Sequence, residues 1–238
     1  MNHLSKKNHQ SPNPPGNARS IIRTVEKVIY HTREIFELQL SRHNHKYLPG
    51  QYLSLFSNES DVCREYSIAS GINESWFGFI IKHLAGGKVT EFLYQLQSRD
   101  TIQTSLPAGS FRPGFEHGKG DFIFIATGTG IAPFLSYLKS YPQKPPLKLL
   151  YGVRYLQDAI GYPDLFKLCS LQLAISREKI KGHHHGRLTN LLKTLPLLQN
   201  IHYYLCGLDT MIQEISDWLH HHGIDLSHIH HEIFVLKP

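Results

Sequence analysis

The chain has 238 residues, a formal net charge of +6, 41% hydrophobic residues and 11% aromatic residues. This length allows one large domain or two ordinary domains with a sizeable core. The positive charge is spread thinly along the sequence, which argues against a nucleic-acid-binding protein. No apolar run approaches the length of a membrane helix, about 18 residues, so membrane insertion is not expected.

Residues 1–18 are polar and proline-rich and contain no apolar segment typical of a secretory signal, so they are expected to form a disordered tail. The three cysteines Cys63, Cys169 and Cys206 lie far apart and form no CxxC motif. This spacing argues against a disulfide framework, a structural zinc site and a self-contained iron–sulfur cluster. A cytoplasmic location is expected.

Residues 19–115 consist of six short alternating segments separated by turn residues, which predicts an antiparallel barrel or sandwich. The segments are IIRTVEKVIY, IFELQLS, QYLSLFS, REYSIAS, WFGFIIKHL and DTIQTSLP. One helix, KVTEFLYQL, is expected from Lys88, after the paired glycines Gly86 and Gly87.

Residues 116–238 follow a different pattern, in which apolar strands alternate with turns and helical segments. The expected strands are DFIFIA, LKLLYGV, LQLAIS, IHYYLCG and HEIFVL. The expected helical segments are APFLSYLKSY, QDAIGYPDLFKLC, GRLTNLLKTL and DTMIQEISDWLHHH. This alternation predicts a five-stranded parallel α/β domain.

Two short stretches point to a ligand with phosphate groups and a flat ring. In CREYSIAS, Arg64 and Tyr66 share one face of a strand, where a guanidinium can bind phosphate and a tyrosine can stack on a ring. ATGTGIAPF follows a strand and opens a helix, so its backbone amides can receive phosphate. Each stretch alone also fits an ordinary strand or a tight turn.

Histidine is abundant, with 17 copies and several short runs. Imidazole clusters can bind metals. Consecutive residues of one element point in different directions, however, and no cysteine or carboxylate set completes a coordination geometry. No metal site is expected.

Nine short motifs occur in the order found in one family: PGQY, REYSIAS, GGKVT, LPAGSF, TGTGIAPF, YGVR, SRE, YLCG and HEIF. Over residues 19–236 the chain therefore resembles the ferredoxin-NADP reductase-like flavoenzymes. The resemblance implies an FAD-binding barrel domain at 19–115 and a nicotinamide-binding domain at 116–238.

The resemblance also implies roles for individual residues. Arg64 would pair with the FAD pyrophosphate, Tyr66 would pack on the flavin and Ser67 would hydrogen-bond near its reactive nitrogen. The further cofactor contacts that it implies are Ile80, Ile81, Lys82, Gly87, Lys88, Val89, Thr90, Thr129, Gly130 and Pro133. Ser176 and Arg177, assisted by Arg154 and Arg187, would hold the 2′-phosphate of NADPH. Ser67, Cys206 and Glu232 would form the catalytic set, in which Cys206 positions the nicotinamide, and Phe234 would cover the flavin face.

The expected activity is that of an FAD-dependent oxidoreductase that takes hydride from NADPH and passes electrons to a ferredoxin, a flavodoxin or an oxygenase component. Two alternatives stay open: a flavin reductase that uses free flavin as a substrate, and a non-catalytic interaction or metal-sensing subunit. The residues after Phe234, VLKP, differ from the aromatic ending of many plant-type members. They are closer to flavohaemoglobin and oxygenase-reductase domains.

Overall fold

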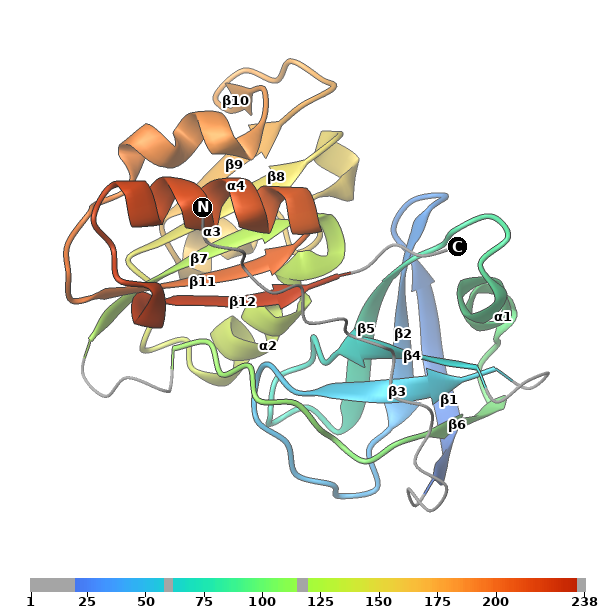
Figure 1. Cartoon of the computed structure of the whole chain (residues 1–238). Coiled ribbons are helices and arrows are strands. Elements are labelled where there is room, and N and C mark those ends of the chain that lie inside the picture. Colours follow the sequence, from blue (N-terminus) through green and yellow to red (C-terminus); the bar gives the residue numbers. More distant parts are fainter. Residues whose placement is uncertain (1–19, 58–61, 115–119, 235–238) are drawn as a thin grey trace, which may run out of the picture.

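The computed structural model describes residues 20–57, 62–114 and 120–234. They form two domains that lie side by side, each built on one six-stranded sheet (Figure 1). The expected tail, residues 1–18, and the expected domain boundary after residue 115 lie outside the described residues.

The structure of the first domain confirms the six strands that the sequence predicts, and they form one antiparallel sheet. They are β1 (Ile21–Tyr30), β2 (Ile35–Ser41), β3 (Tyr52–Phe56), β4 (Cys63–Ser67), β5 (Trp76–Lys82) and β6 (Thr101–Thr104). Their order is β4-β3-β6-β1-β2-β5, and every neighbouring pair is antiparallel. The sheet curls so that its two edges meet. Just after the edge strand β4, the amide of Ala69 donates to the carbonyl of Gly78 on the other edge strand, β5, at 2.7 Å. The predicted helix is α1 (Lys88–Gln95).

The second domain has a parallel sheet with one strand more than predicted. The strands are β7 (Asp121–Thr127), β8 (Lys148–Val153), β9 (Leu171–Ile175), β10 (His184–His185), β11 (Ile201–Gly207) and β12 (Ile229–Ile233), in the order β10-β9-β8-β7-β11-β12. The additional strand β10 is a two-residue edge strand, too short to leave a periodic pattern in the sequence. From β7 the chain continues through β8, β9 and β10 on one side of the sheet and then returns to β11 and β12 on the other side of β7. Ligands of open α/β sheets bind at such a switch point, where the strand order reverses.

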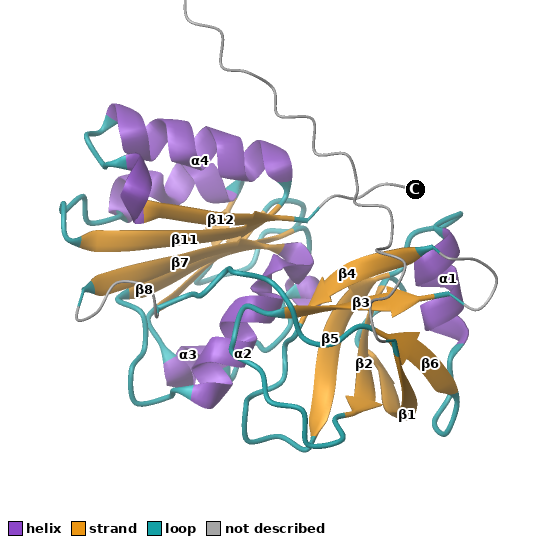
Figure 2. Cartoon of the chain, turned by 60° about the horizontal axis from the view of Figure 1, so that its bottom comes forward, coloured by secondary structure: helices purple, strands orange, loops and turns teal. Residues whose placement is uncertain are grey.

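Helices cover both faces of the parallel sheet (Figure 2). α4 (Asp209–His221) lies on one face, and α2 (Ala132–Ser140) and α3 (Leu165–Leu168) lie on the other. The connections also contain four 3₁₀ turns: η1 (Gly128–Ile131), η2 (Leu156–Asp158), η3 (Leu188–Thr194) and η4 (Leu226–His228).

The segment QDAIGYPDLFKLC forms only η2 and the single turn α3, not the long helix that the pattern predicts. Gly161 adopts a left-handed φ of 85°, and Pro163 lacks the amide that a helix interior needs, so the two residues interrupt the helix. The segment GRLTNLLKTL likewise forms the 3₁₀ turn η3. Among the described residues, no helix is both long enough and apolar enough to cross a membrane.

Candidate active site at the domain boundary

Three side chains from both domains converge where β12 of the second domain approaches β4 of the barrel. The hydroxyl of Ser67 donates to Oε2 of Glu232 at 2.8 Å, across 165 positions of sequence. The sulfur of Cys206 lies 3.9 Å from the same oxygen. Cys206 and Glu232 are also register partners in the parallel pair β11–β12. The structure thus brings together the three residues expected to be catalytic.

Ser67 and Cys206 of this cluster are buried and Glu232 is half-buried, and this loss of solvent controls the ionisation of the cluster. Loss of solvent raises the pKa of Glu232 to about 7, against the lowering effect of the hydrogen bond from Ser67 and with a further increase from the charge of Glu65. The thiol of Cys206 is completely buried, and burial together with the charge of Glu232 raises its pKa well above the usual value. Cys206 is therefore a neutral thiol at pH 7, and a neutral thiol is a poor nucleophile. This chemistry fits a positioning role.

The glycine turn packs directly against this cluster. A side chain at Gly130 would place its Cβ 2.6 Å from the carbonyl carbon of Cys206 and 2.7 Å from Cα of Gly207. Only glycine permits this approach, which puts Thr129 and Gly130 beside the end of β11. Pro133 lies in the first turn of α2, where its missing amide is not needed.

The last described residue, Phe234, lies next to the same cluster. Its amide donates to the carbonyl of Gly207 at 2.8 Å, which continues the pairing of β12 with β11 for one more residue. Its half-buried side chain packs against the core cluster that contains Cys206.

One end of the barrel has groups that suit a ligand with phosphate groups and a flat ring, and we call this region the cradle. Arg64 is exposed on β4, and its Nη1 donates to the carbonyl of Cys63 at 3.0 Å. Tyr66 is half-buried on the same strand, and burial raises the pKa of its phenol. α1 lies at the end of the barrel where β4 begins (Figures 1 and 2), and its N-terminus has no side-chain cap. Uncapped helix amides, a guanidinium and a tyrosine ring are the groups that suit the pyrophosphate and ring of FAD.

The remaining residues expected at this cradle fall into two groups. Ile80, Ile81 and Val89 are buried in the protein core, so their side chains serve packing first. The hydroxyl of Thr90 already donates to the carbonyls of Leu84 and Gly87, at 3.2 and 3.1 Å. Contacts from these four residues to a ligand would therefore come mainly through the backbone.

Lys82 and Lys88 are the two lysines among the expected cofactor contacts of the barrel domain. The ammonium of Lys82 lies 3.0 Å from the carboxylate of Glu34, in the turn between β1 and β2. Lys88 is exposed at the first residue of α1, next to the N-cap residue Gly87. Both cations can face solvent or a ligand.

Three of the four residues expected to bind the 2′-phosphate lie together at the ends of neighbouring strands. The amide of Ser176 donates to the carbonyl of Val153 at 3.0 Å, and that of Arg177 donates to the carbonyl of Arg154 at 2.9 Å. Both arginines are exposed. Arg187 instead lies 3.5 Å from Glu214 of α4, so a ligand would have to compete with this ion pair.

One acidic residue that no sequence motif singles out, Glu34, lies near this basic group. Ion pairing with Lys82 lowers the pKa of Glu34, and the positive charges of Arg154 and Arg177 lower it further. A cleft of about 610 Å³ is lined by His31 of the barrel and, in the second domain, by Glu178 and residues between 155 and 162. Nothing in the local sequence pattern marks Glu34 or His31 as neighbours of this segment.

A few of the histidines stack on other aromatic rings, among them His202 and His230. His202 lies with its Nδ1 3.1 Å from Nε2 of His230, and His230 stacks on Tyr204 with ring centroids 4.6 Å apart. Within the described ranges, no group of three or more histidine, cysteine or acidic residues has an arrangement that could hold a metal ion.

Comparison with known proteins gives the same two-part organisation. Residues 21–112 match the model of the oxidoreductase FAD-binding domain, and residues 124–217 match that of the oxidoreductase NAD-binding domain. The chain is 30% identical to the reductase component of the naphthalene 1,2-dioxygenase system of Pseudomonas putida, over 91% of this chain and 70% of that protein. It is also 30% identical to the anthranilate 1,2-dioxygenase electron transfer component of Acinetobacter baylyi, over 89% of this chain and 66% of that protein.

A third relative is the toluate 1,2-dioxygenase electron transfer component of Pseudomonas putida, 28% identical over 79% of this chain. The chain spans 59% of that relative, so it corresponds to less than two thirds of the toluate and anthranilate components. Among solved structures, a ferredoxin NADP+ reductase from Neisseria gonorrhoeae with bound FAD and NADP has the same fold, with a TM-score of 0.83 and 22% identity over 91% of this chain and 99% of that one.

The two domain matches, the naphthalene reductase relative and the shared fold lead to one conclusion. The chain belongs to the ferredoxin-NADP reductase-like family of FAD- and NAD(P)-binding oxidoreductases.

Proposed function

We propose that the protein is an FAD-dependent oxidoreductase that takes hydride from NADPH and passes the electrons to a redox protein. The observation that carries this proposal is the part-buried contact of Ser67, Cys206 and Glu232, built from both domains. A hydride can pass only between groups in close contact. A cluster at the boundary of an FAD-binding and an NAD-binding domain is where the two cofactors could meet.

FAD would be held by the barrel domain, which we place at residues 19–115. Arg64 and the first amides of α1 would bind its pyrophosphate, and Tyr66 would pack on its ring system. Ser67, whose hydroxyl reaches the domain boundary, would hydrogen-bond at the reacting edge. When bound, FAD supplies a centre that accepts two electrons as hydride and can release them one at a time.

NADPH would lie across the switch point of the second domain, which we place at residues 116–238. The turn at Thr129 and Gly130 would receive its phosphates, and Arg154, Ser176 and Arg177 would hold its 2′-phosphate. Cys206 and Glu232 would set the approach of its nicotinamide. Phe234 would exclude water from the flavin face when no nicotinamide is present.

The electron acceptor is proposed to be a ferredoxin, a flavodoxin or an oxygenase component. The relatives named above are parts of dioxygenase systems, which supports an acceptor of this class. An iron–sulfur relay, if one is used, would lie outside these 238 residues, because their three cysteines show no cluster spacing.

We also propose that the protein works in the cytoplasm. All three cysteines are unpaired, which fits a reducing compartment. Cell fractionation followed by detection of the protein would test this location.

The visible spectrum of the purified protein, followed by anaerobic mixing with NADPH, tests the activity. A yellow protein with about one FAD per chain that NADPH bleaches agrees with the proposal. A colourless protein that reduces added free flavin would identify a flavin reductase instead. A protein that neither retains flavin nor oxidises NADPH would identify a non-catalytic subunit.

A further inference from the structure

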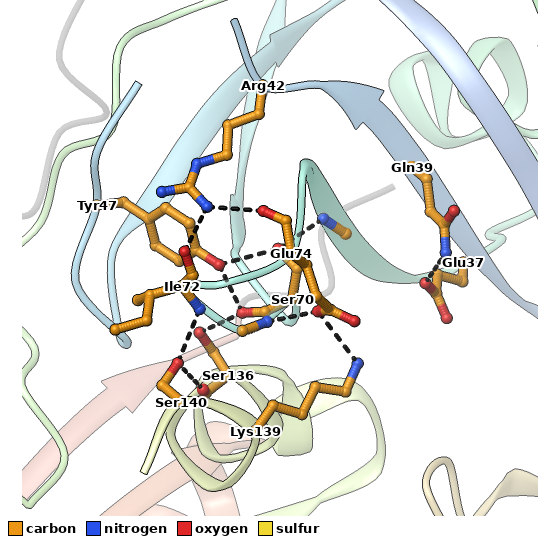
Figure 3. A network of polar contacts seen from close by, with 12 residues as sticks. Glu37, Gln39, Arg42, Tyr47, Ser70, Ile72, Glu74, Ser136, Lys139 and Ser140 are labelled. Atoms are coloured by element: carbon orange, nitrogen blue, oxygen red, sulfur yellow. Dashed lines mark hydrogen bonds and ion pairs between the residues drawn. The ribbon is translucent and has the colours of Figure 1, made fainter. Parts of the chain in front are cut away.

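A row of hydrogen bonds joins helix α2 of the second domain to the barrel segment that follows β4 (Figure 3). The hydroxyl of Ser136 donates to the carbonyl of Ser70 at 2.6 Å. The hydroxyl of Ser140 accepts from the amide of Ile72 at 3.0 Å and donates to the carbonyl of Ser136 at 2.6 Å. We call these four residues the interdomain seam.

The serines of the seam are buried, and the two domains are closely packed there. Ser136 is completely buried and Ser70 is 1% exposed. A side chain at Gly71 would place its Cβ 2.9 Å from Cβ of Lys139, so the barrel segment touches the helix directly. At the rim, the ammonium of Lys139 lies 3.7 Å from the carboxylate of Glu74. Hydrogen bonds that exclude water hold their geometry more tightly than exposed ones.

The barrel holds its side of the seam just as firmly. The hydroxyl of Tyr47 donates to the same carbonyl of Ser70 at 2.7 Å. The guanidinium of Arg42 donates to the carbonyls of Ile72 and Glu74 at 2.6 and 2.7 Å. A displacement of the helix at the seam is therefore passed on to the barrel segment that carries Arg42 and Tyr47.

The position of the seam relative to the candidate site gives it a function. Ser70 is three residues after Ser67, which ends β4, the strand that would carry the flavin contacts. Helix α2 begins directly after the turn that contains Gly130, where the nucleotide phosphates would bind. The seam is thus a short, rigid link between the element that holds one cofactor and the element that holds the other.

We propose that Ser136 is a positioning residue that fixes the distance between the bound nicotinamide and the flavin, an inference that rests on the proposed function. Ser136 touches neither cofactor in this scheme. It acts by holding α2 against Ser70. Because rates depend steeply on the alignment of the reacting groups, a shift of a fraction of an ångström is enough to slow the reaction.

The test is Ser136→Ala, measured by single-turnover reduction of the flavin at saturating NADPH. We expect the rate to fall about tenfold. The affinities for FAD and NADPH should stay near wild type, since no contact to either is removed. The carbonyl of Ser70 keeps its bond from Tyr47, so the substitution leaves no buried acceptor without a donor.

Tyr47→Phe is the matched control. It removes the hydrogen bond that the barrel donates to the same carbonyl and leaves the bonds from Ser136 to Ser70 and from Ile72 to Ser140 in place, so it should lower stability and leave the reduction rate within about twofold of wild type. Should Ser136→Ala fail to fold, Lys139→Met replaces it. This partly exposed side chain is at the rim, and its loss should slow reduction about threefold.

Amide hydrogen exchange gives a second measurement that does not depend on activity. In Ser136→Ala, the amide of Ile72, whose acceptor lies on the other domain, should exchange faster. The amide of Ala69, whose acceptor is Gly78 of the barrel, should not change.

The outcomes separate this inference from the proposed function. Wild-type flavin that NADPH does not reduce would refute the function itself. Wild-type reduction at a normal rate, combined with an unchanged rate in Ser136→Ala, would refute the positioning role alone. An equal loss in Tyr47→Phe, or unchanged exchange at Ile72, would also refute it.

Discussion

Replacing Glu232 with glutamine isolates the effect of one half-buried carboxyl group at the domain boundary. The side chain accepts a hydrogen bond from Ser67 at 2.8 Å, and its pKa is raised by burial to about 7 from an ordinary value of 4.5. Glutamine keeps an oxygen that can accept this bond and cannot ionise. A comparison of the two proteins across pH therefore reports the cost of charging Glu232.

The sign of the effect follows from the direction of the pKa shift. The folded protein binds the proton of Glu232 more tightly than the unfolded chain does, so the neutral carboxyl favours folding. This contribution is fully present below about pH 4.5 and is lost as the pH rises through about 7. The shift corresponds to about 3 kcal/mol, since one pKa unit equals about 1.4 kcal/mol.

Urea unfolding at a series of pH values on both sides of this window measures the difference. The free energy of unfolding of the wild type, relative to Glu232→Gln, should fall by up to about 3 kcal/mol as the pH rises through the window. Glu26→Gln, which changes an exposed carboxylate on β1, should show no comparable dependence. A difference between wild type and Glu232→Gln that stays constant with pH would refute the reasoning.

Three further substitutions test the cofactor contacts. Arg64→Ala should weaken the affinity for FAD about tenfold to a hundredfold, because it removes a charge-assisted bond to phosphate. Flavin fluorescence titration measures this affinity, and an unchanged value would exclude the contact. Arg177→Ala should raise KM for NADPH but leave KM for NADH nearly unchanged, since only NADPH carries the 2′-phosphate; equal losses in steady-state assays would place Arg177 elsewhere. Gly130→Ala should impair NADPH binding and flavin reduction while FAD is retained, because its new methyl group would overlap the carbonyl of Cys206. An NADPH affinity of this variant equal to that of the wild type would contradict this.

The fold was largely predictable because it follows local patterns. The segment IFELQLS alternates, and in β2 its residues alternate between buried and partly exposed positions over most of their length. The turn ATGTGIAPF was predicted from its glycines, and the structure shows the close approach that Gly130 makes possible. The unpredicted features have no such periodicity: β10 has two residues, and the helix expected after β8 is interrupted at Gly161 and Pro163.

The candidate site was less accessible to local reasoning. The contact between Ser67 and Glu232 spans 165 positions, so only the family resemblance linked the two residues. The seam had no signal at all, because Ser70 and Ser136 are ordinary polar residues until docking of the domains buries them. The ion pair of Arg187 with Glu214 was likewise hidden, since it depends on how α4 packs beside η3.

The site and the seam are two results of one docking event. Glu232 comes from the second domain and Ser67 from the barrel, so their hydrogen bond exists only while the domains are in contact. The same contact removes solvent from Glu232 and raises its pKa, so ionisation of this carboxyl and separation of the domains favour each other. The seam opposes that separation with bonds between uncharged groups, Ser136 to Ser70 and Ile72 to Ser140, which do not titrate. It therefore holds the domains together at pH values where a charged Glu232 would push them apart.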